Sequence, residues 1–280
     1  MLNVSSWGLE GRALVGFIDR QKNLVKRYWA WEIVWVVYNV VNVLSVGFLG
    51  EGLGHVGGGT RTPAELHRTQ LYLLVGSLLW GYLSMVFIEI AYAIEIERWE
   101  GTIEYTFMAP MRRITHLFGV CIFAILYGFA RSAVVLVIAV LMFHLDLTQA
   151  DAGAGALVLA ASIVPLVGMG IVASVMPLLS PEKGEQITMV LEGVILLVAG
   201  VYYPLSVLPL PLQILGRAVP LTYTLDGMRQ SIVFGRGLGA VAGDVITLVA
   251  IGIVLVPLGL LVFTLAERRA KRLGLLKRSG

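Results

Sequence analysis

Long apolar runs separated by short polar connections make up most of the chain. A transmembrane helix needs roughly 20 mostly apolar residues to cross the hydrocarbon core of a bilayer. Six stretches meet that length, at about 30–50, 70–94, 114–143, 156–179, 187–204 and 241–265. These runs are continuous, whereas the strands of a membrane barrel alternate apolar and polar positions. The pattern therefore predicts an all-α integral membrane protein whose six transmembrane helices occupy residues 30–265.

Composition excludes most other classes of protein. Hydrophobic residues make up 58% of the 280 positions and charged residues only 14%, whereas soluble domains carry about 45–50% apolar and about 25% charged residues. A water-soluble globule of this size could not bury so much apolar surface. The net charge of +3 is modest, and the basic clusters flank apolar runs instead of forming a nucleic-acid-binding surface.

Lysine and arginine residues are distributed unevenly between the two sides of the predicted membrane domain. Cytoplasmic connections are enriched in both residue types. One side carries Arg12, Arg20, Lys22, Lys26, Arg27, Arg98, Arg112, Arg113, Lys183, Arg268, Arg269, Lys271, Arg272, Lys277 and Arg278, whereas the other carries Arg61, Arg68, Arg217, Arg229 and Arg236. The asymmetry predicts that both termini are cytoplasmic, and that residues 266–280 form a basic cytoplasmic tail.

The first segment, residues 1–29, predicts an amphipathic helix ahead of the first span. Helical spacing between residues 7 and 26 gathers one largely apolar face, formed by Leu14, Phe17, Ile18, Gln21, Leu24 and Val25. Charged residues fall on the other faces, which is typical of a helix lying along the cytoplasmic membrane surface. A short amphipathic helix packed on protein is the alternative.

Signatures of catalysis are missing from the sequence. It contains no G-x-x-x-x-G-K-[ST] phosphate-binding loop, so ATP hydrolysis of that class would need another chain. The four histidines show no metal-ligand spacing, and no serine lies in a G-x-S-x-G context. We therefore predict no catalytic, cofactor-binding or metal-binding residues on this chain, and we do not expect an enzyme.

Three ionisable residues lie deep in the predicted spans: Glu89, Arg131 and Glu192. Such residues are costly in a membrane and often mark a transport path. From the helical rise, Arg131 could lie close enough in depth to either glutamate for an ion pair. Polar residues that line a translocation path and a structural ion pair between helices are both consistent with this set.

Two connecting segments are more specific than the rest. On the cytoplasmic side, at about 95–112, Glu97, Glu100 and Glu104 are spaced three and four apart, which predicts one acidic helical face for docking a soluble partner. Pro110 closes that segment. A solvated loop is the alternative interpretation.

The other segment, at about 204–237, lies on the external side. It contains four prolines within seventeen residues, yet it stays largely apolar. Short helices that dip into the outer leaflet, as a re-entrant hairpin, would satisfy both facts. We expect Leu208, Leu212 and Leu215 to pack against the fifth and sixth spans. Asp226 and Arg229, three residues apart, could pair locally.

At these two segments the sequence resembles the permease subunit of ABC-2 type exporters. The matching pieces are E-x-x-E-G-T-x-E…P, from Glu97 to Pro110, and Y-P-L-x-x-L-P…P-L-T-Y-x-x-D-x-x-R, from Tyr203 to Arg229. The predicted spans, cytoplasmic termini and N-terminal helix agree with the family. The resemblance implies ATPase-coupling residues at Glu97, Glu100, Gly101, Thr102, Glu104 and Pro110. The candidate external gate comprises Tyr203, Pro204, Leu208, Pro209, Leu212, Pro220, Asp226 and Arg229.

The resemblance also implies partners and a mechanism. Two copies of a soluble ATPase, which bind ATP and Mg, would drive two permease copies between inward-open and outward-open states. The two permeases would form a homodimer, or a heterodimer of related chains, in a bacterial or archaeal cytoplasmic membrane. Family substrates include drugs, antibiotics, lipids and lipid-linked glycans, and the scarcity of charge in the spans favours an amphipathic or apolar one. An ion-coupled secondary transporter or a channel is the alternative function.

Overall fold

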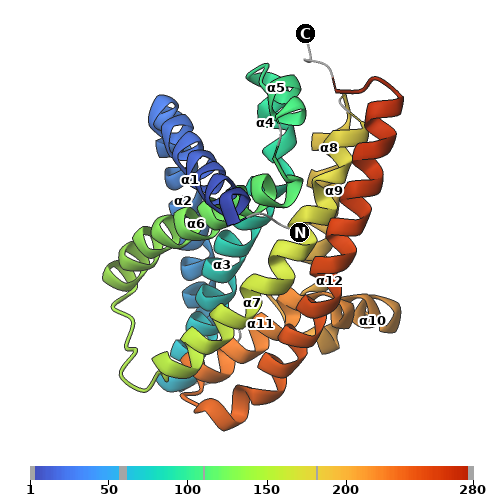
Figure 1. Cartoon of the computed structure of the whole chain (residues 1–280). Helices are drawn as coiled ribbons and strands as arrows, with labels where there is room; N and C mark the ends of the chain where they lie inside the picture. The colour runs from blue at the N-terminus through green and yellow to red at the C-terminus, as the bar shows by residue number, and fades with distance from the viewer. Residues whose placement is uncertain (1–3, 57–61, 110, 181, 277–280) are drawn as a thin grey trace.

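The structure, a computed structural model, describes residues 4–56, 62–109, 111–180 and 182–276. Within those ranges the chain is helical and contains no strand. The elements, coloured along the chain in Figure 1, are α1 (Val4–Arg27), α2 (Trp29–Val56), α3 (Pro63–Ala91), α4 (Ala93–Trp99), α5 (Ile103–Met108), α6 (Arg113–Phe143), α7 (Ala152–Ala173), α8 (Val175–Leu179), α9 (Gly184–Val198), η1 (Leu205–Val207), α10 (Leu210–Ala218), α11 (Pro220–Met228), η2 (Arg229–Val233) and α12 (Leu238–Arg272).

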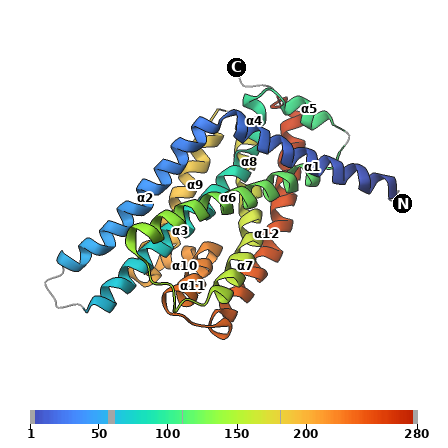
Figure 2. The same cartoon turned by 90° about the vertical axis from the view of Figure 1, so that its left-hand side faces the viewer.

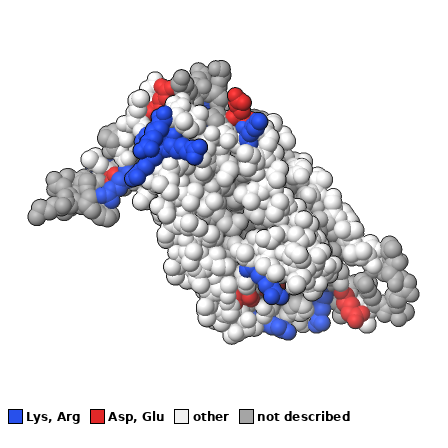
Figure 3. Space-filling model, turned by 90° about the vertical axis from the view of Figure 1, so that its right-hand side faces the viewer, with Lys and Arg blue, Asp and Glu red and all other residues white. Residues whose placement is uncertain are grey.

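Five helical stretches are long and apolar enough to cross a membrane. They are Trp29–Leu53, Glu65–Ala91, Arg113–Phe143, Ala152–Leu179 and Leu238–Arg272. On the face drawn in Figure 3, charged side chains gather toward the two ends of the molecule, with a broad uncharged belt between them. The belt and the five stretches confirm an all-helical membrane protein, and their positions match five of the six predicted runs.

The run predicted at 187–204 is the exception. Its helix, α9, has 15 residues, which at 1.5 Å per residue gives about 22 Å, short of a 30 Å hydrocarbon core. The helix ends because Gly200 adopts a positive φ of 74°, and a Cβ there would lie 2.9 Å from the carbonyl oxygen of Tyr203. A count of six spans therefore stays a prediction.

The long helices pack around α3 and along the pair α7–α12. α3 contacts α2, α6 and α7, and it is the most buried of the candidate spans. α7 and α12 lie side by side in both cartoon views (Figures 1 and 2). Their backbones approach closely because glycine occupies the contact: a Cβ at Gly168 would lie 2.8 Å from Leu255, and one at Gly252 would lie 2.7 Å from Val164.

The N-terminal helix α1 lies across one end of the bundle and packs on α6 (Figure 2). Its predicted apolar face points inward: Gln21 is buried, and the other five members of that face are partly buried. Phe17 lies 4.7 Å, ring centre to ring centre, from His116 of α6. The face predicted from helical spacing thus contacts protein, and a location along the membrane surface stays a prediction.

Candidate functional site

The segment between α3 and α6 folds as two short helices joined by a tight elbow. The amide of Thr102 bonds to the carbonyl of Glu97 (2.8 Å), and the amide of Gly101 bonds to the carbonyl of Arg98 (3.1 Å). This pair of bonds is the Schellman helix end, which needs a left-handed residue, and Gly101 supplies it with a φ of 73°. The E-G-T sequence therefore ends α4 and redirects the chain into α5.

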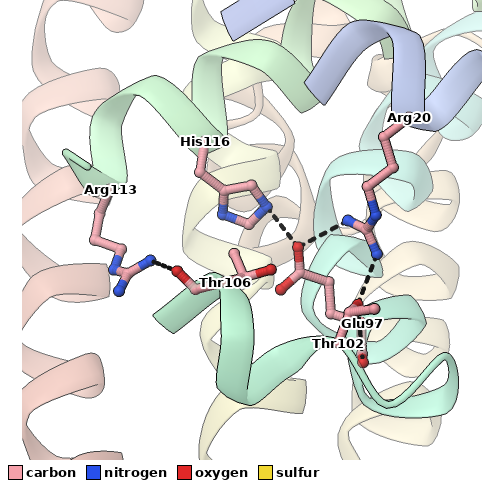
Figure 4. Close-up of polar contacts among 6 residues, drawn as sticks. All are labelled: Arg20, Glu97, Thr102, Thr106, Arg113 and His116. Carbon is pink, nitrogen blue, oxygen red and sulfur yellow. Dashed lines mark hydrogen bonds and ion pairs between the residues drawn. The ribbon is translucent and has the colours of Figure 1, made fainter. Parts of the chain in front are cut away.

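Glu97 lies at the centre of a buried polar cluster that joins three helices. Its carboxylate accepts a hydrogen bond from Arg20 of α1 (2.9 Å) and lies 3.0 Å from Nε2 of His116 of α6. The guanidinium of Arg20 also donates to Oγ1 of Thr102 (2.9 Å), as Figure 4 shows. Glu97 is 0% exposed, so this carboxylate fastens the elbow to α1 and α6 and does not face solvent.

Glu100 and Glu104 differ from Glu97 in what they contact. Glu100 bonds to Arg27 (3.2 Å) and to the hydroxyl of Tyr28 (2.8 Å), at the junction of α1 and α2. Glu104 lies on α5 with its side chain exposed. The prediction of one acidic helical face is therefore wrong, because the turn at Gly101 puts Glu97 and Glu104 on different helices. The coupling role of these residues stays a prediction, and Pro110 lies outside the described residues.

Two arginines missed by the sequence interpretation also anchor this segment. Arg113 of α6 pairs with Glu267 of α12 (3.1 Å) and donates to the carbonyls of Thr106 and Phe107 in α5. Arg98, almost fully buried, donates to the carbonyl of Leu178 at the end of α8 (2.9 Å). No sequence spacing signals these contacts, because the partners of Arg98 and Glu267 lie 80 and 154 residues away.

Burial shifts the pKa values of two charged side chains of α4. The pKa of the Glu95 carboxyl is raised, first by burial and then by the nearby charge of Glu185, while Arg98 opposes the shift. The pKa of the Arg98 guanidinium is lowered by burial, and Glu95 partly restores it. The inner side of α4 is thus a dry environment in which charged groups depend on one another.

The two short helices expose three large side chains. Trp99 is 63% exposed, Tyr105 79% and Met108 82%. Glu104, also exposed, follows the elbow on the same segment. Together these four residues form what we call the α4–α5 surface. Aromatic residues and methionine are enriched in the centres of protein interfaces, and here they sit on a base fixed by the buried Glu97 cluster.

At the opposite end, the predicted gate segment is a broken hairpin. Pro204 and Pro209 precede η1 and α10, and Pro220 begins α11. The hydroxyl of Tyr203 donates to the carbonyl of Leu197 (2.6 Å) and folds the turn back on α9. Leu208 and Leu212 are partly buried. α10 contacts α9 and α11.

The prediction that Leu215 packs against the spans is wrong. Leu215 is 53% exposed. The residue of α10 that faces α9 is Gly216 instead, where a Cβ would lie 2.3 Å from the carbonyl oxygen of Val198. The gate itself stays a prediction.

Arg229 does not pair with Asp226 as predicted. Its guanidinium donates to the carbonyls of Gly200 (3.0 Å) and Val201 (2.6 Å), and it lies over the ring of Tyr72 at 3.6 Å. Space beside it is tight, since a Cβ at Gly76 would lie 2.2 Å from the Val201 oxygen. Arg229 therefore satisfies the carbonyls exposed where α9 ends and joins that turn to α3.

The deep ionisable residues also pair differently from the prediction. Arg131 lies 3.9 Å from Glu32 of α2, whose carboxylate accepts from the hydroxyl of Tyr127 (2.6 Å). Glu192 accepts a hydrogen bond from the hydroxyl of Ser84. Among the described residues neither Glu192 nor Glu89 makes an ion pair, so Arg131 bridges to neither of the two glutamates expected. Whether these residues line a path stays a prediction.

A comparison with known protein families gives a match over most of the chain. The model of the ABC-2 type transporter family matches residues 17–233, from within α1 to the end of η2. No curated protein matches the sequence. The matched region contains the Glu97 cluster, the α4–α5 surface and the hairpin of η1 and α10, and it covers well over half of the chain. This chain belongs to the ABC-2 type transporter family.

Proposed function

We propose that this chain is the membrane-spanning permease of an ATP-binding cassette exporter. In this proposal, a separate ATPase subunit drives alternating access, and an amphipathic or apolar substrate moves outward. Family membership supports the permease role, and it implies in general an ABC ATPase partner. ATP and Mg would bind to that partner, in two copies, and both termini would face the cytoplasm of the cell.

The observation that carries the proposal is the α4–α5 surface and its attachment. Trp99, Tyr105 and Met108 are exposed on the two short helices that follow α3. The elbow between these helices would not be needed if their side chains only contacted lipid. A partner bound there would push on α5, and Arg113 would pass that force to α6 and α12. Glu97 would pass it to α1 and α6. One contact area thus reaches three long helices.

A second copy of the permease completes the proposal, as a homodimer or as a heterodimer with a related chain. α2, α6 and α12 present largely exposed apolar faces, which can serve lipid or a partner helix. The substrate path would then run between two permeases, with the hairpin of η1 and α10 closing its outer end. Twofold contacts between identical surfaces are the commonest closed arrangement.

The test is affinity purification of the full chain in mild detergent, followed by identification of the bound chains. We expect a soluble ATP-binding protein to be recovered with the native chain. Replacing Tyr105 and Met108 together with serine should lower its recovery by about tenfold or more, as at an interface centre. Leu273→Ser, at an exposed leucine directly after the end of α12, is the matched control and should leave recovery unchanged. Recovery of no ATP-binding chain with the native protein would reject the proposal.

A further inference from the structure

One side of the C-terminal part of α12 changes abruptly from leucine to arginine. Leu258, Leu261 and Leu265 are exposed, and Arg268 and Arg272, further along the helix, are exposed as well. Successive members of this set are three or four residues apart, so all five share one side of the helix. We call this set the α12 stripe. It has an apolar half and a cationic half.

The arginines at this end of α12 have no acidic partner. Arg269 lies beside the stripe and is also exposed. Within the described part of the chain, no ion pair includes Arg268, Arg269 or Arg272. The carboxylate closest to them in sequence, Glu267, is buried on the opposite side of the helix, where it already has two basic partners. Three exposed guanidinium groups are therefore left without a counter-charge.

The helix end that carries these arginines is fixed. The amide of Leu275 bonds to the carbonyl of Ala270 (3.0 Å), and the amide of Gly274 bonds to the carbonyl of Lys271 (3.3 Å). This is a Schellman end, and Gly274 supplies its left-handed residue with a φ of 66°. The backbone under the arginines is thus ordered before any ligand binds, which lowers the entropy that binding costs.

The change from leucine to arginine lies at the depth of lipid headgroups. Residues 245–266 carry no charge and extend over about 33 Å as a helix, which matches a hydrocarbon core of about 30 Å. Arg268 and Arg272 follow within about 10 Å. Their side chains lean back toward the membrane, because the Cα–Cβ bonds of a helix tilt toward its N-terminus. The guanidinium groups therefore reach the headgroup layer.

The two halves of the stripe fit one kind of molecule. Guanidinium groups bind phosphate oxygens through paired hydrogen bonds, and exposed leucines at hydrocarbon depth contact acyl chains. A second copy of this chain fits less well, because a twofold contact of α12 with itself would bring the arginines of both copies together. A soluble protein would reach the arginines but not the leucines.

We propose that the α12 stripe binds an anionic phospholipid, whose phosphate meets the arginines and whose acyl chains lie along the leucines. With the orientation predicted from the sequence, this lipid belongs to the cytoplasmic leaflet, where anionic phospholipids attract basic residues. The inference goes beyond the proposed function, since it involves neither the transported substrate nor the ATPase.

The experiment is native mass spectrometry of the full chain in detergent, which counts the lipids that stay bound. Dioleoyl phosphatidylglycerol, which is anionic, and dioleoyl phosphatidylcholine, which is zwitterionic, have the same acyl chains and are titrated separately. We expect the first phosphatidylglycerol to bind about tenfold or more tightly than the first phosphatidylcholine. An excess of glycerol 3-phosphate should not displace it, because this soluble headgroup cannot contact the leucines.

Paired variants show whether the α12 arginines cause the preference. Arg268→Gln combined with Arg272→Gln should remove most of it. The matched control is Arg217→Gln combined with Arg236→Gln, which removes the same charge from two exposed arginines at the opposite end of the molecule. This control should keep the preference.

Equal binding of the two lipids to the native chain would overturn the inference. An equal loss of preference in both double variants would overturn it too, because the attraction would then follow net charge. Displacement by glycerol 3-phosphate would mark a phosphate site instead. If the α12 variant keeps the lipid preference but recovers less of the ATP-binding chain, the arginines contact that protein and the inference is wrong. The lipid readout needs no ATPase, so its failure is separate from that of the proposed function.

Discussion

The two ends of the molecule are stabilised by different kinds of polar contact. At the basic end, which comprises α1, α4, α5 and the last turns of α12, charged side chains pair across long separations in sequence, such as the 77 residues between Arg20 and Glu97. At the hairpin end, formed by η1, α10, α11 and η2, side chains bond mostly to nearby backbone carbonyls. Tyr203, Tyr223 and Thr222 each bond to a carbonyl six residues earlier.

This difference has a physical reason and a mechanical consequence. Buried backbone groups left without a partner are costly, and the irregular hairpin satisfies several carbonyls with side chains a few residues away. Many of the polar contacts of the hairpin end are therefore local. The basic end instead joins separate helices through charged groups, and such contacts can be exchanged for water or a partner when helices move. We expect the basic end to relay motion and the hairpin end to keep its local structure.

The largest effect at the hairpin end should come from Arg229. Arg229→Met would leave the carbonyls of Gly200 and Val201 without their donor, and each buried unsatisfied group costs about 1–3 kcal/mol. We expect a loss of about 2–4 kcal/mol in unfolding free energy, seen as a lower thermal midpoint of the purified protein. Arg217→Met, at an exposed arginine of α10, is the control and should change stability little. Equal midpoints for the two variants would contradict the carbonyl-capping role.

The second effect separates two glutamates of the basic end. Glu97→Lys would place an ammonium beside Arg20 and His116 in a fully buried site. Breaking a buried ion pair in this way lowers the unfolding free energy by about 3–5 kcal/mol. The partly exposed Arg20 can regain part of that loss by contact with solvent. Glu104→Lys changes an exposed side chain, so it should leave the thermal midpoint unchanged and lower the recovery of the ATPase. The measurement is the midpoint and the ATPase yield of both variants. If the two substitutions behave alike, the distinction between a buried clamp and a docking residue is wrong.

Much of the long-helix framework was predictable from hydrophobicity. The run predicted at 114–143 became Arg113–Phe143, because a thirty-residue run that is mostly apolar leaves one structural solution in a membrane. The inward face of α1 was predictable too, since helical spacing alone gathers Leu14, Phe17 and Gln21 on one side. Periodicity indicates which side of a helix is apolar, and the prediction for α1 depended only on that property.

The contacts of the candidate site were not predictable in the same way. Spacing suggested Asp226 for Arg229, yet the carbonyls it binds lie 28 and 29 residues earlier, and backbone acceptors leave no mark in a sequence. Spacing also placed Glu97 and Glu104 on one face, although Gly101 between them was the available sign that the helix ends. The pairing of Glu97 with His116 depends on how α4 and α6 pack, which periodicity does not encode.

A third effect tests the elbow that separates those two glutamates. Gly101 has a φ of 73°, and a residue with a Cβ pays about 1–2 kcal/mol in that conformation. Gly101→Ala should therefore lower the unfolding free energy by about that amount and reduce ATPase-coupled transport. Gly16→Ala is the control: Gly16 lies inside α1 with open space at its Cβ position, and alanine there should stabilise the helix by up to about 1 kcal/mol. Stability changes of the same sign would contradict the assignment of the elbow.

The smallest effect concerns the second charge pair of the basic end, Arg27–Glu100. Its nitrogen–oxygen distance of 3.2 Å is similar to that of Arg20–Glu97, but the Arg27 side chain is 64% exposed and that of Arg20 only 26%. Exposed pairs contribute about 0.2–1 kcal/mol and weaken in salt. Double-mutant cycles to alanine should give a small coupling energy for Arg27–Glu100 that falls at high salt.

The same cycle on Arg20–Glu97 should give a larger coupling energy that changes less with salt, because its carboxylate is shielded from water and ions. Both cycles can be followed by the thermal midpoint of the purified chain, with unfolding run at low and at high ionic strength. Distance alone would predict equal couplings for the two pairs. A coupling that tracks burial instead would show that the clamp between α1 and α4 depends on the dry environment around Glu97, which is the property that distinguishes this end from an ordinary charged surface.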